Sequence, residues 1–154
     1  FITNAIDDEP LPLYGDGGQV RDWLYVLDNC RAIDLVMHRG TPGEIYNVGA
    51  SNERVNIEVA EAILGLLEKS PELIRHVTDR PGHDRRYSLD SSKLHGLGWS
   101  PSRSHEEALE ETVRWYVDNQ WWWREIKSGG FADYYQSNYG ERLRRTQRTR
   151  RSPA

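Results

Sequence analysis

Short strand-like runs alternate with helix-like periodic segments along this chain, and that order limits the possible folds more than any other feature of the sequence. Four runs rich in β-branched, aromatic or alternating residues predict strands: Leu11–Tyr14, Gln19–Val26, Glu44–Val48 and Leu73–Val77. Between and after them, apolar residues three and four positions apart predict helices. The order therefore predicts an α/β fold of the mixed α+β kind, with short strands and several helices.

Turn and cap residues indicate where these elements begin and end. The turn Gly15–Gly18 predicts a hairpin between the first two strands. Asp28 and Asn56 are candidate caps of the two helices that follow them, and Ser104 with Glu107 matches a capping box. Further helices are expected at Phe1–Ile6, Asp90–Leu94, Glu106–Asn119, Trp121–Lys127 and Phe131–Tyr139. Because Phe1–Ile6 reads as the last turns of a helix without a cap or a starting methionine, we expect a piece of a longer chain.

Length and composition fit one globular domain without a membrane segment. The chain has 154 residues, of which 37% are hydrophobic and 29% charged, ordinary values for a globular chain. Its longest apolar runs, such as Ala62–Leu67, fall far short of the roughly 18–20 residues that span a membrane, and the first nine residues do not resemble a signal peptide. Cys30 is the single cysteine, and no cysteine and histidine cluster has zinc spacing. We expect a cytoplasmic protein with no metal and no membrane partner.

The charge distribution divides the chain in two. Six of the 20 basic residues follow Glu141, where no acid occurs, so residues 142–154 carry +6. The first 141 residues hold 14 basic against 24 acidic residues and carry −10. We therefore predict a folded domain over residues 1–141 and a basic, disordered tail over 142–154. The alternatives are that the tail contacts nucleic acid or that it contacts the acidic surface of the chain. No interleaved aromatic residue or known motif supports nucleic-acid binding.

The familiar catalytic motifs of nucleotide enzymes are missing from the sequence. Gly15-Asp16-Gly17 continues to Val20 where a dinucleotide-binding turn would carry its third glycine. None of the three lysines has a tyrosine four residues earlier, and there is neither a Walker phosphate loop nor a nucleophile elbow. We therefore assign no catalytic and no cofactor-binding residue to this chain.

Arginines in two segments suggest anion binding instead. Arg21 lies within a predicted strand, and Arg80, Arg85 and Arg86 surround His83 in a loop bent by proline and glycine. The planar guanidinium forms paired, charge-assisted hydrogen bonds that suit a diphosphate. The alternative is that these arginines only pair with the aspartates nearby in the sequence: Asp22, Asp79, Asp84 and Asp90.

Two long motifs resemble a known family. The run Leu11–Val26 resembles the extended short-chain dehydrogenases/reductases that act on nucleotide sugars. The run Asp79-Arg80-Pro81-Gly82-His83-Asp84-Arg85-Arg86-Tyr87 is similar to the dTDP-glucose 4,6-dehydratases rather than to epimerases, UDP-glucuronate decarboxylases or GDP-mannose dehydratases. The resemblance covers nearly all of residues 1–141.

The resemblance implies the C-terminal, substrate-binding part of a Rossmann-type enzyme whose N-terminal half is absent here. The full enzyme, a homodimer, would use NAD, whereas this chain alone would bind none and would be inactive. The chain would contact the dTDP-sugar, and the residues that match the family's substrate contacts are Pro12, Tyr14, Arg21, Asn56, Arg80, His83 and Tyr139. For Tyr139, ordinary helix packing is the alternative.

Three consecutive tryptophans, Trp121-Trp122-Trp123, stand outside this pattern. One helix cannot direct all three toward one core, so at least one should be exposed or covered by another surface. They could cluster with Trp115 and Tyr116 or form a contact face. A contact face of this kind would suit an interaction protein. Two other functions also stay open: a sister enzyme for UDP- or GDP-sugars, and an independent nucleotide-sugar-binding module.

Overall fold

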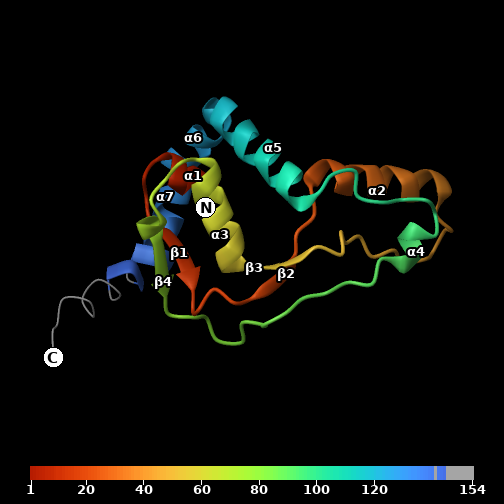
Figure 1. Cartoon of the computed structure of the whole chain (residues 1–154), viewed down its shortest axis with the longest axis horizontal. Coiled ribbons are helices and arrows are strands. Elements are labelled where there is room, and N and C mark those ends of the chain that lie inside the picture. Colours follow the sequence, from red (N-terminus) through yellow and green to blue (C-terminus); the bar gives the residue numbers. More distant parts are fainter. Residues whose placement is uncertain (141, 145–154) are drawn as a thin grey trace.

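An arm that carries α2 (Val26–Arg39) and α4 (Ser92–His95) extends from a helix-rich body (Figure 1). The computed structural model describes residues 1–140 and 142–144. Of the predicted tail, only residues 142–144 are described, and they are helical. The prediction for the rest of the tail lies outside the described residues.

The strands form two small sheets rather than the predicted hairpin. β1 (Leu11–Tyr14) pairs in parallel with β4 (Ile74–Val77), with Tyr14 opposite Val77. β2 (Val20–Asp22) pairs antiparallel with β3 (Glu53–Val55). The hairpin prediction is wrong because β1 finds its partner far away in the sequence, where Gly15 N also donates to Val77 O at 2.9 Å.

Two predicted caps and one predicted strand are also wrong. α2 begins at Val26 after the extended Tyr25, and Asp28 is buried inside its first turn. α3 (Asn56–Leu66) begins at Asn56 itself, because β3 runs directly into it. Residues 44–48 have no regular secondary structure, since no described segment pairs with them.

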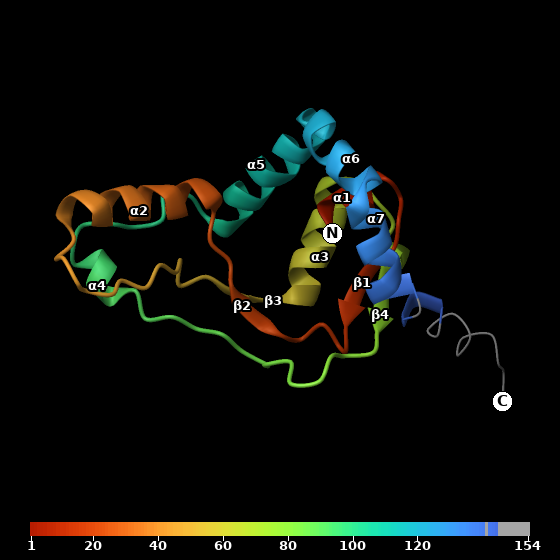
Figure 2. The ribbon, with the colours of Figure 1, turned by 180° about the vertical axis from the view of Figure 1, so that it is seen from behind.

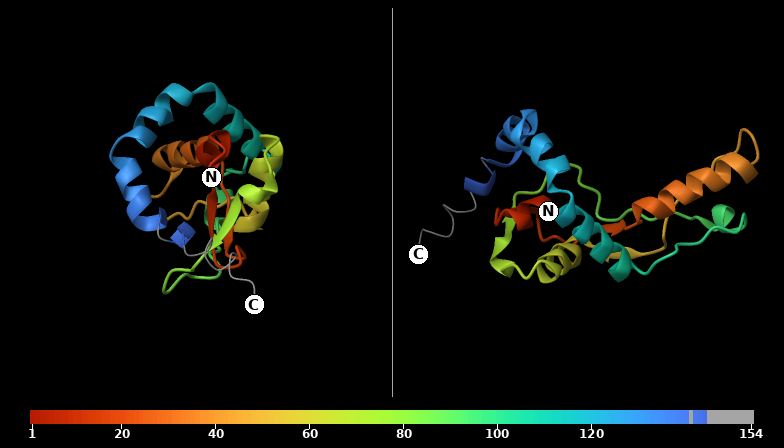
Figure 3. Two further views of the ribbon diagram at one scale, coloured as in Figure 1. Left: turned by 90° about the vertical axis from the view of Figure 1, so that its left-hand side faces the viewer. Right: turned by 90° about the horizontal axis from the view of Figure 1, so that it is seen from above.

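Apart from a short 3-10 turn that the sequence did not predict, the remaining helices follow the predicted positions closely. They are α1 (Ile2–Ile6), a 3-10 turn (Pro71–Leu73), α5 (His105–Asp118), α6 (Gln120–Ser128), α7 (Gly130–Tyr135) and a π-helical turn (Gln136–Gly140). The capping box is confirmed: Ser104 Oγ accepts from Glu107 N while the Glu107 carboxylate accepts from Ser104 N. α5, α6 and α7 follow one another in an arc (Figure 3), and this arc returns the chain to β1.

Two separate apolar cores hold the body and the arm. The body core packs α3 and β1 against α1 and α5, and its buried members are Ala5, Leu11, Val59, Ala60, Ile63, Leu64 and Val113. The arm core consists of Ala32, Leu94 and Trp99. The predicted mixed α/β fold is confirmed.

The three consecutive tryptophans divide as expected. Trp123 is buried at 3% exposure, whereas Trp121 is 72% exposed. The Trp122 ring lies 5.4 Å from the ring of Trp115, edge to face, and Trp115 also contacts Tyr116. The expectation that at least one would be exposed is confirmed.

No helix in the described part of the chain is long and apolar enough to cross a membrane. Residues 1–140 and 142–144 also contain no group of three acidic, histidine or cysteine side chains that could hold a metal ion.

Candidate functional site

The loop of residues 79–87 is held against the edge of β2. Val20 N donates to Arg85 O at 2.8 Å, and Tyr87 N donates to Val20 O at 3.2 Å, so Val20 forms a parallel bridge with Arg86. Figure 2 shows the segment after β4 passing along β2 on its way to α4. The loop is therefore positioned by main-chain hydrogen bonds and not only by its side chains.

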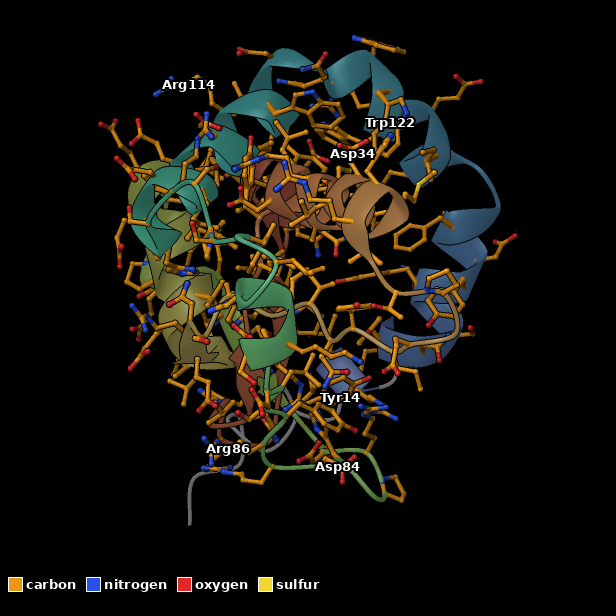
Figure 4. All side chains as sticks on the ribbon, turned by 90° about the vertical axis from the view of Figure 1, so that its right-hand side faces the viewer. Tyr14, Asp34, Asp84, Arg86, Arg114 and Trp122 are labelled. Atoms are coloured by element: carbon orange, nitrogen blue, oxygen red, sulfur yellow. The ribbon has the colours of Figure 1, made fainter. Side chains whose placement is uncertain are left out.

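Aromatic side chains from three distant segments meet beside this loop. Tyr14, at the end of β1, contacts the edge of the His83 ring at 5.7 Å and the Tyr139 ring at 6.1 Å, measured between ring centroids. Burial, together with a hydrogen bond to Tyr14, raises the pKa of Tyr139 to about 12. The structure thus brings together three residues that the sequence named, and Figure 4 shows Tyr14 beside the loop that carries Asp84 and Arg86.

One further cation joins this group. The Arg142 guanidinium lies 5.1 Å from the centroid of the Tyr14 ring, within cation–π range, and donates to Thr78 O at 3.2 Å. Sequence reasoning missed Arg142 because it was counted with the basic tail. Its contact with the Tyr14 ring could not be read from the sequence.

The arginines of the site fall into two classes. Arg85 forms an ion pair with Asp16 at 2.7 Å, and Arg86 holds both oxygens of Glu53 at 2.8 and 2.9 Å. Arg21 instead donates to two main-chain carbonyls, Val20 O at 2.6 Å and Asp84 O at 3.1 Å, and its guanidinium lies 4.4 Å from the centroid of the Tyr87 ring.

Arg80 is exposed, and only its main-chain N–H is bonded in the described contacts, to Asp79 at 2.8 Å. Among the described residues, neither Arg21 nor Arg80 forms an ion pair with a carboxylate. Two of the nearby aspartates are occupied otherwise: Asp22 accepts from the main chain at residues 51 and 52, and Asp84 from the Tyr87 hydroxyl. Asp79 lies near enough to attract Arg80, but its oxygens accept from His83, Gln19 and the Arg80 main chain. Two guanidinium groups are thus left for an anion.

Asp79 connects the loop to Gln19, the residue that precedes β2. Its Oδ1 accepts from His83 Nδ1 at 2.6 Å and its Oδ2 accepts from Gln19 Nε2 at 3.0 Å. The hydrogen bond from His83 is the largest cause of the lowered pKa of Asp79. Sequence reasoning considered Asp79 only as a partner for arginine and did not single out Gln19.

The last two predicted residues flank this arrangement. Pro12 is buried two residues before Tyr14 on β1, so both lie on the same face of the strand. Asn56 is half-buried at the start of α3 and is joined to the site through its main chain, since Asn56 N donates to Gln19 O at 3.0 Å.

These groups together suit a ligand that has both negative charge and a flat ring. Paired guanidinium donors recognise phosphate oxygens, and the tyrosine and histidine rings offer an apolar wall with polar edges. The site is therefore suited to a nucleotide.

Comparisons with known proteins identify the family of the chain. The family model described as GDP-mannose 4,6 dehydratase matches residues 1–112. The dTDP-glucose 4,6-dehydratase of Neisseria meningitidis serogroup B is 47% identical over 143 residues, which are 85% of this chain and 40% of that protein.

Solved structures show the same relationship. A dTDP-glucose 4,6-dehydratase from Bacillus anthracis, in complex with NAD, has a TM-score of 0.76 at 49% identity and covers 81% of this chain and 40% of its own. The enzyme from Streptomyces venezuelae, also with NAD bound, has a TM-score of 0.77 at 44% identity and covers 81% of this chain and 39% of its own.

The chain spans about 40% of the length of the relatives it matches, and it corresponds to their C-terminal portion. The resemblance seen in the two sequence motifs is thus confirmed by relatives named dTDP-glucose 4,6-dehydratase. Since the family model covers 112 of the 154 residues, the chain belongs to the GDP-mannose 4,6 dehydratase family of extended short-chain dehydrogenases/reductases.

Proposed function

We propose that this chain is the nucleotide-sugar-binding portion of a dTDP-glucose 4,6-dehydratase. The observation that carries the proposal is the pair Arg21 and Arg80, neither of which forms an ion pair with a carboxylate among the described residues. Both belong to the surroundings of the loop that carries His83, because Arg80 is part of that loop and Arg21 donates to Asp84 O within it. The other two arginines of the site, Arg85 and Arg86, are already neutralised.

The proposed role of each residue follows from where its side chain lies. Arg21 and Arg80 would bind the diphosphate through charge-assisted hydrogen bonds. Tyr14, His83 and Tyr139 would line the nucleotide, with Pro12 and Asn56 at the margins of the site. The position of Tyr139 supports this, because its ring lies 6.1 Å from the Tyr14 ring, measured between ring centroids.

The glycine turn Gly15–Gly18 does not fit the diphosphate of the cofactor NAD. The turn Gly15–Gly18 joins β1 to β2 instead of opening a helix. Two of its amides are already used, because Gly17 N donates to Tyr14 O and Gly18 N donates to Asp16 Oδ1. We therefore propose that NAD, which the Bacillus anthracis relative binds, is held in the full enzyme by residues outside this chain, and we assign no step of hydride transfer to residues here.

The full enzyme would convert dTDP-glucose to dTDP-4-keto-6-deoxyglucose and water. In that reaction, binding of the diphosphate, remote from the reacting carbons, would place the hexose correctly for the chemistry. This chain would supply that binding and the nucleotide specificity, and an N-terminal half would supply the reacting groups. The same resemblance predicts a cytoplasmic homodimer.

A sister activity on GDP-sugars is the second candidate, because the matching family model carries the name of a GDP-mannose enzyme. Relatives at 49% and 43% identity carry the dTDP-glucose name, which favours the first candidate.

The test is calorimetric titration of the chain with dTDP, and separately with UDP and GDP for comparison. We expect dTDP to bind most tightly, and Arg21→Ala or Arg80→Ala to weaken binding by about 1.5–3 kcal/mol, the range for a hydrogen bond to a charged group. Arg103→Ala is the matched control, because Arg103 pairs with Glu111 at 2.8 Å, outside the site.

Preference for GDP would favour the sister activity. If dTDP, UDP and GDP all fail to bind, the nucleotide-binding role of this chain is wrong.

A further inference from the structure

We propose that Asp79 is the positioning residue of this site: it holds His83 and the peptide of Arg80 in place for the nucleotide. The inference rests on the proposed function and adds a residue to it. Asp79 lies at the start of the loop, where its two oxygens reach three groups from two separate segments, the loop itself and residue 19.

The contact with His83 determines which ring nitrogen carries hydrogen. Nδ1 lies 2.6 Å from Asp79 Oδ1, and a carboxylate can only accept a hydrogen bond. Nδ1 is therefore protonated, and Nε2 is the nitrogen directed away from Asp79. Because the His83 side chain is only 7% exposed and its ring meets Tyr14 edge to face, the ring has little freedom to turn over.

Gln19 fixes the carboxylate from the other side. Gln19 is 2% exposed, and its Nε2 donates to Asp79 Oδ2 at 3.0 Å. This orientation leaves Gln19 Oε1 buried with no hydrogen-bond partner in the described part of the chain, which costs free energy. The amide is held in this orientation because only its NH₂ end can bond a carboxylate.

The main chain also approaches Asp79 closely. A Cβ atom on Gly15 would lie 3.1 Å from Asp79 Oδ2, and Gly15 has a φ of +56°, so the absence of a side chain there lets the carboxylate sit against the turn after β1. Asp79 Oδ1 meanwhile accepts from Arg80 N at 2.8 Å. Gln19 and the turn at Gly15 thus hold the Asp79 carboxylate in place. The carboxylate in turn holds the His83 ring and the peptide of Arg80.

Asp16 is a second carboxylate that binds the loop of residues 79–87, and it can be compared with Asp79. Asp16 binds the loop through Arg85 at 2.7 Å, and like Asp79 it is exposed, but none of its described contacts is to His83 or to the Arg80 peptide. A role limited to anchoring the loop would be shared by Asp16, whereas positioning of His83 would belong to Asp79 alone.

The experiment measures the tautomer of His83 and the affinity for dTDP in the whole chain. Long-range ¹H–¹⁵N correlation spectra report the tautomer without ligand, with the His83 signals assigned from His83→Ala. We compare Asp79→Ala with the control Asp16→Asn. Asp79→Ser serves if the alanine variant does not fold, because its hydroxyl can still bond Arg80 N but is too short to hold His83 as well.

We expect the Nδ1–H form in the unaltered chain and loss of that preference in Asp79→Ala. Affinity for dTDP should fall by about tenfold, as for loss of a hydrogen bond to a charged group. In a His83→Ala background the same change should cost less than about threefold, because a residue that acts through another gives non-additive effects. Asp16→Asn should leave the tautomer unchanged and the affinity within about twofold.

Three results would overturn the inference alone: an unchanged His83 tautomer in Asp79→Ala, an affinity for dTDP equal to that of the unaltered chain, or an equal loss in Asp16→Asn. Failure of the unaltered chain to bind dTDP would instead overturn the proposed function, and this inference with it.

Discussion

Replacing Asp28 by alanine should weaken the attachment of α2 to the segment before α5 and so lower the stability of the fold. Asp28 is 1% exposed in the first turn of α2. Its Oδ1 accepts from Ser102 Oγ at 2.6 Å and from Arg31 at 2.9 Å, and its Oδ2 accepts from Ser102 N at 3.1 Å. The carboxylate therefore ties α2 to the chain just before α5.

The expected cost follows from these contacts. Each hydrogen bond to a charged acceptor contributes about 1.5–3 kcal/mol, and the two from Ser102 would be lost. Ser102 is exposed enough for water to replace part of them, which favours the lower end. The pair with Arg31, whose side chain is 56% exposed, adds less than about 1 kcal/mol. We therefore expect Asp28→Ala to lower the unfolding free energy by about 3 kcal/mol.

Urea unfolding followed by far-UV circular dichroism measures this loss. Asp34→Ala is the matched control on the same helix (Figure 4), because the Asp34 side chain is 77% exposed and has His38 as its ion-pair partner at 3.5 Å. Its effect should stay within about 0.5 kcal/mol. A loss below about 1 kcal/mol in Asp28→Ala, or equal losses in both variants, would refute the reasoning.

Three further predictions concern the loop and the helix ends. The hydrogen bond from Arg85 lowers the pKa of Asp16 to about 2, so this pair stabilises the fold above about pH 4 and loses that effect as the pH falls toward 2. The difference in unfolding free energy between the unaltered chain and Asp16→Asn should therefore shrink over this pH range. A difference that stays constant between about pH 4 and pH 2 would contradict the prediction. Gly17→Ala should cost more than about 1 kcal/mol in thermal unfolding, because Gly17 has a φ of +74° and a Cβ there would lie 2.5 Å from Leu13 Cδ2; an unchanged midpoint would contradict this. Ser104→Ala should lower the free energy of unfolding in urea by about 1 kcal/mol through loss of the capping box. Ser104→Asp should retain most of the stability, because aspartate also caps helices.

Local patterns predicted the helices well because their signals lie within a few residues. The periodic apolar residues of α3 and the capping box of α5 depend on neighbours three and four positions away. The pairing of β1 with β4 depends on contacts across about sixty residues, which turn residues such as Gly15 cannot reveal. Residues 44–48 have a strand-like sequence but no described partner, and a strand requires one.

The site was predicted from motifs, and the structure supplies what motifs lack. The sequence named Tyr14, His83 and Tyr139, but only the fold shows that their rings meet. Composition could not decide which arginines are neutralised, because the partner of Arg86 is Glu53, more than thirty residues away. Arg142 was hidden in a basic run whose charge pattern says nothing about the aromatic ring it contacts.

The most direct test of the nucleotide site is an NMR titration of the chain with dTDP, with main-chain and arginine side-chain signals assigned. We expect saturable shifts at Arg21, Arg80 and His83, with smaller shifts at Arg103 and Trp122. Shifts confined to the exposed tryptophans of α5 and α6, or no saturable shift at the loop of residues 79–87, would contradict this expectation.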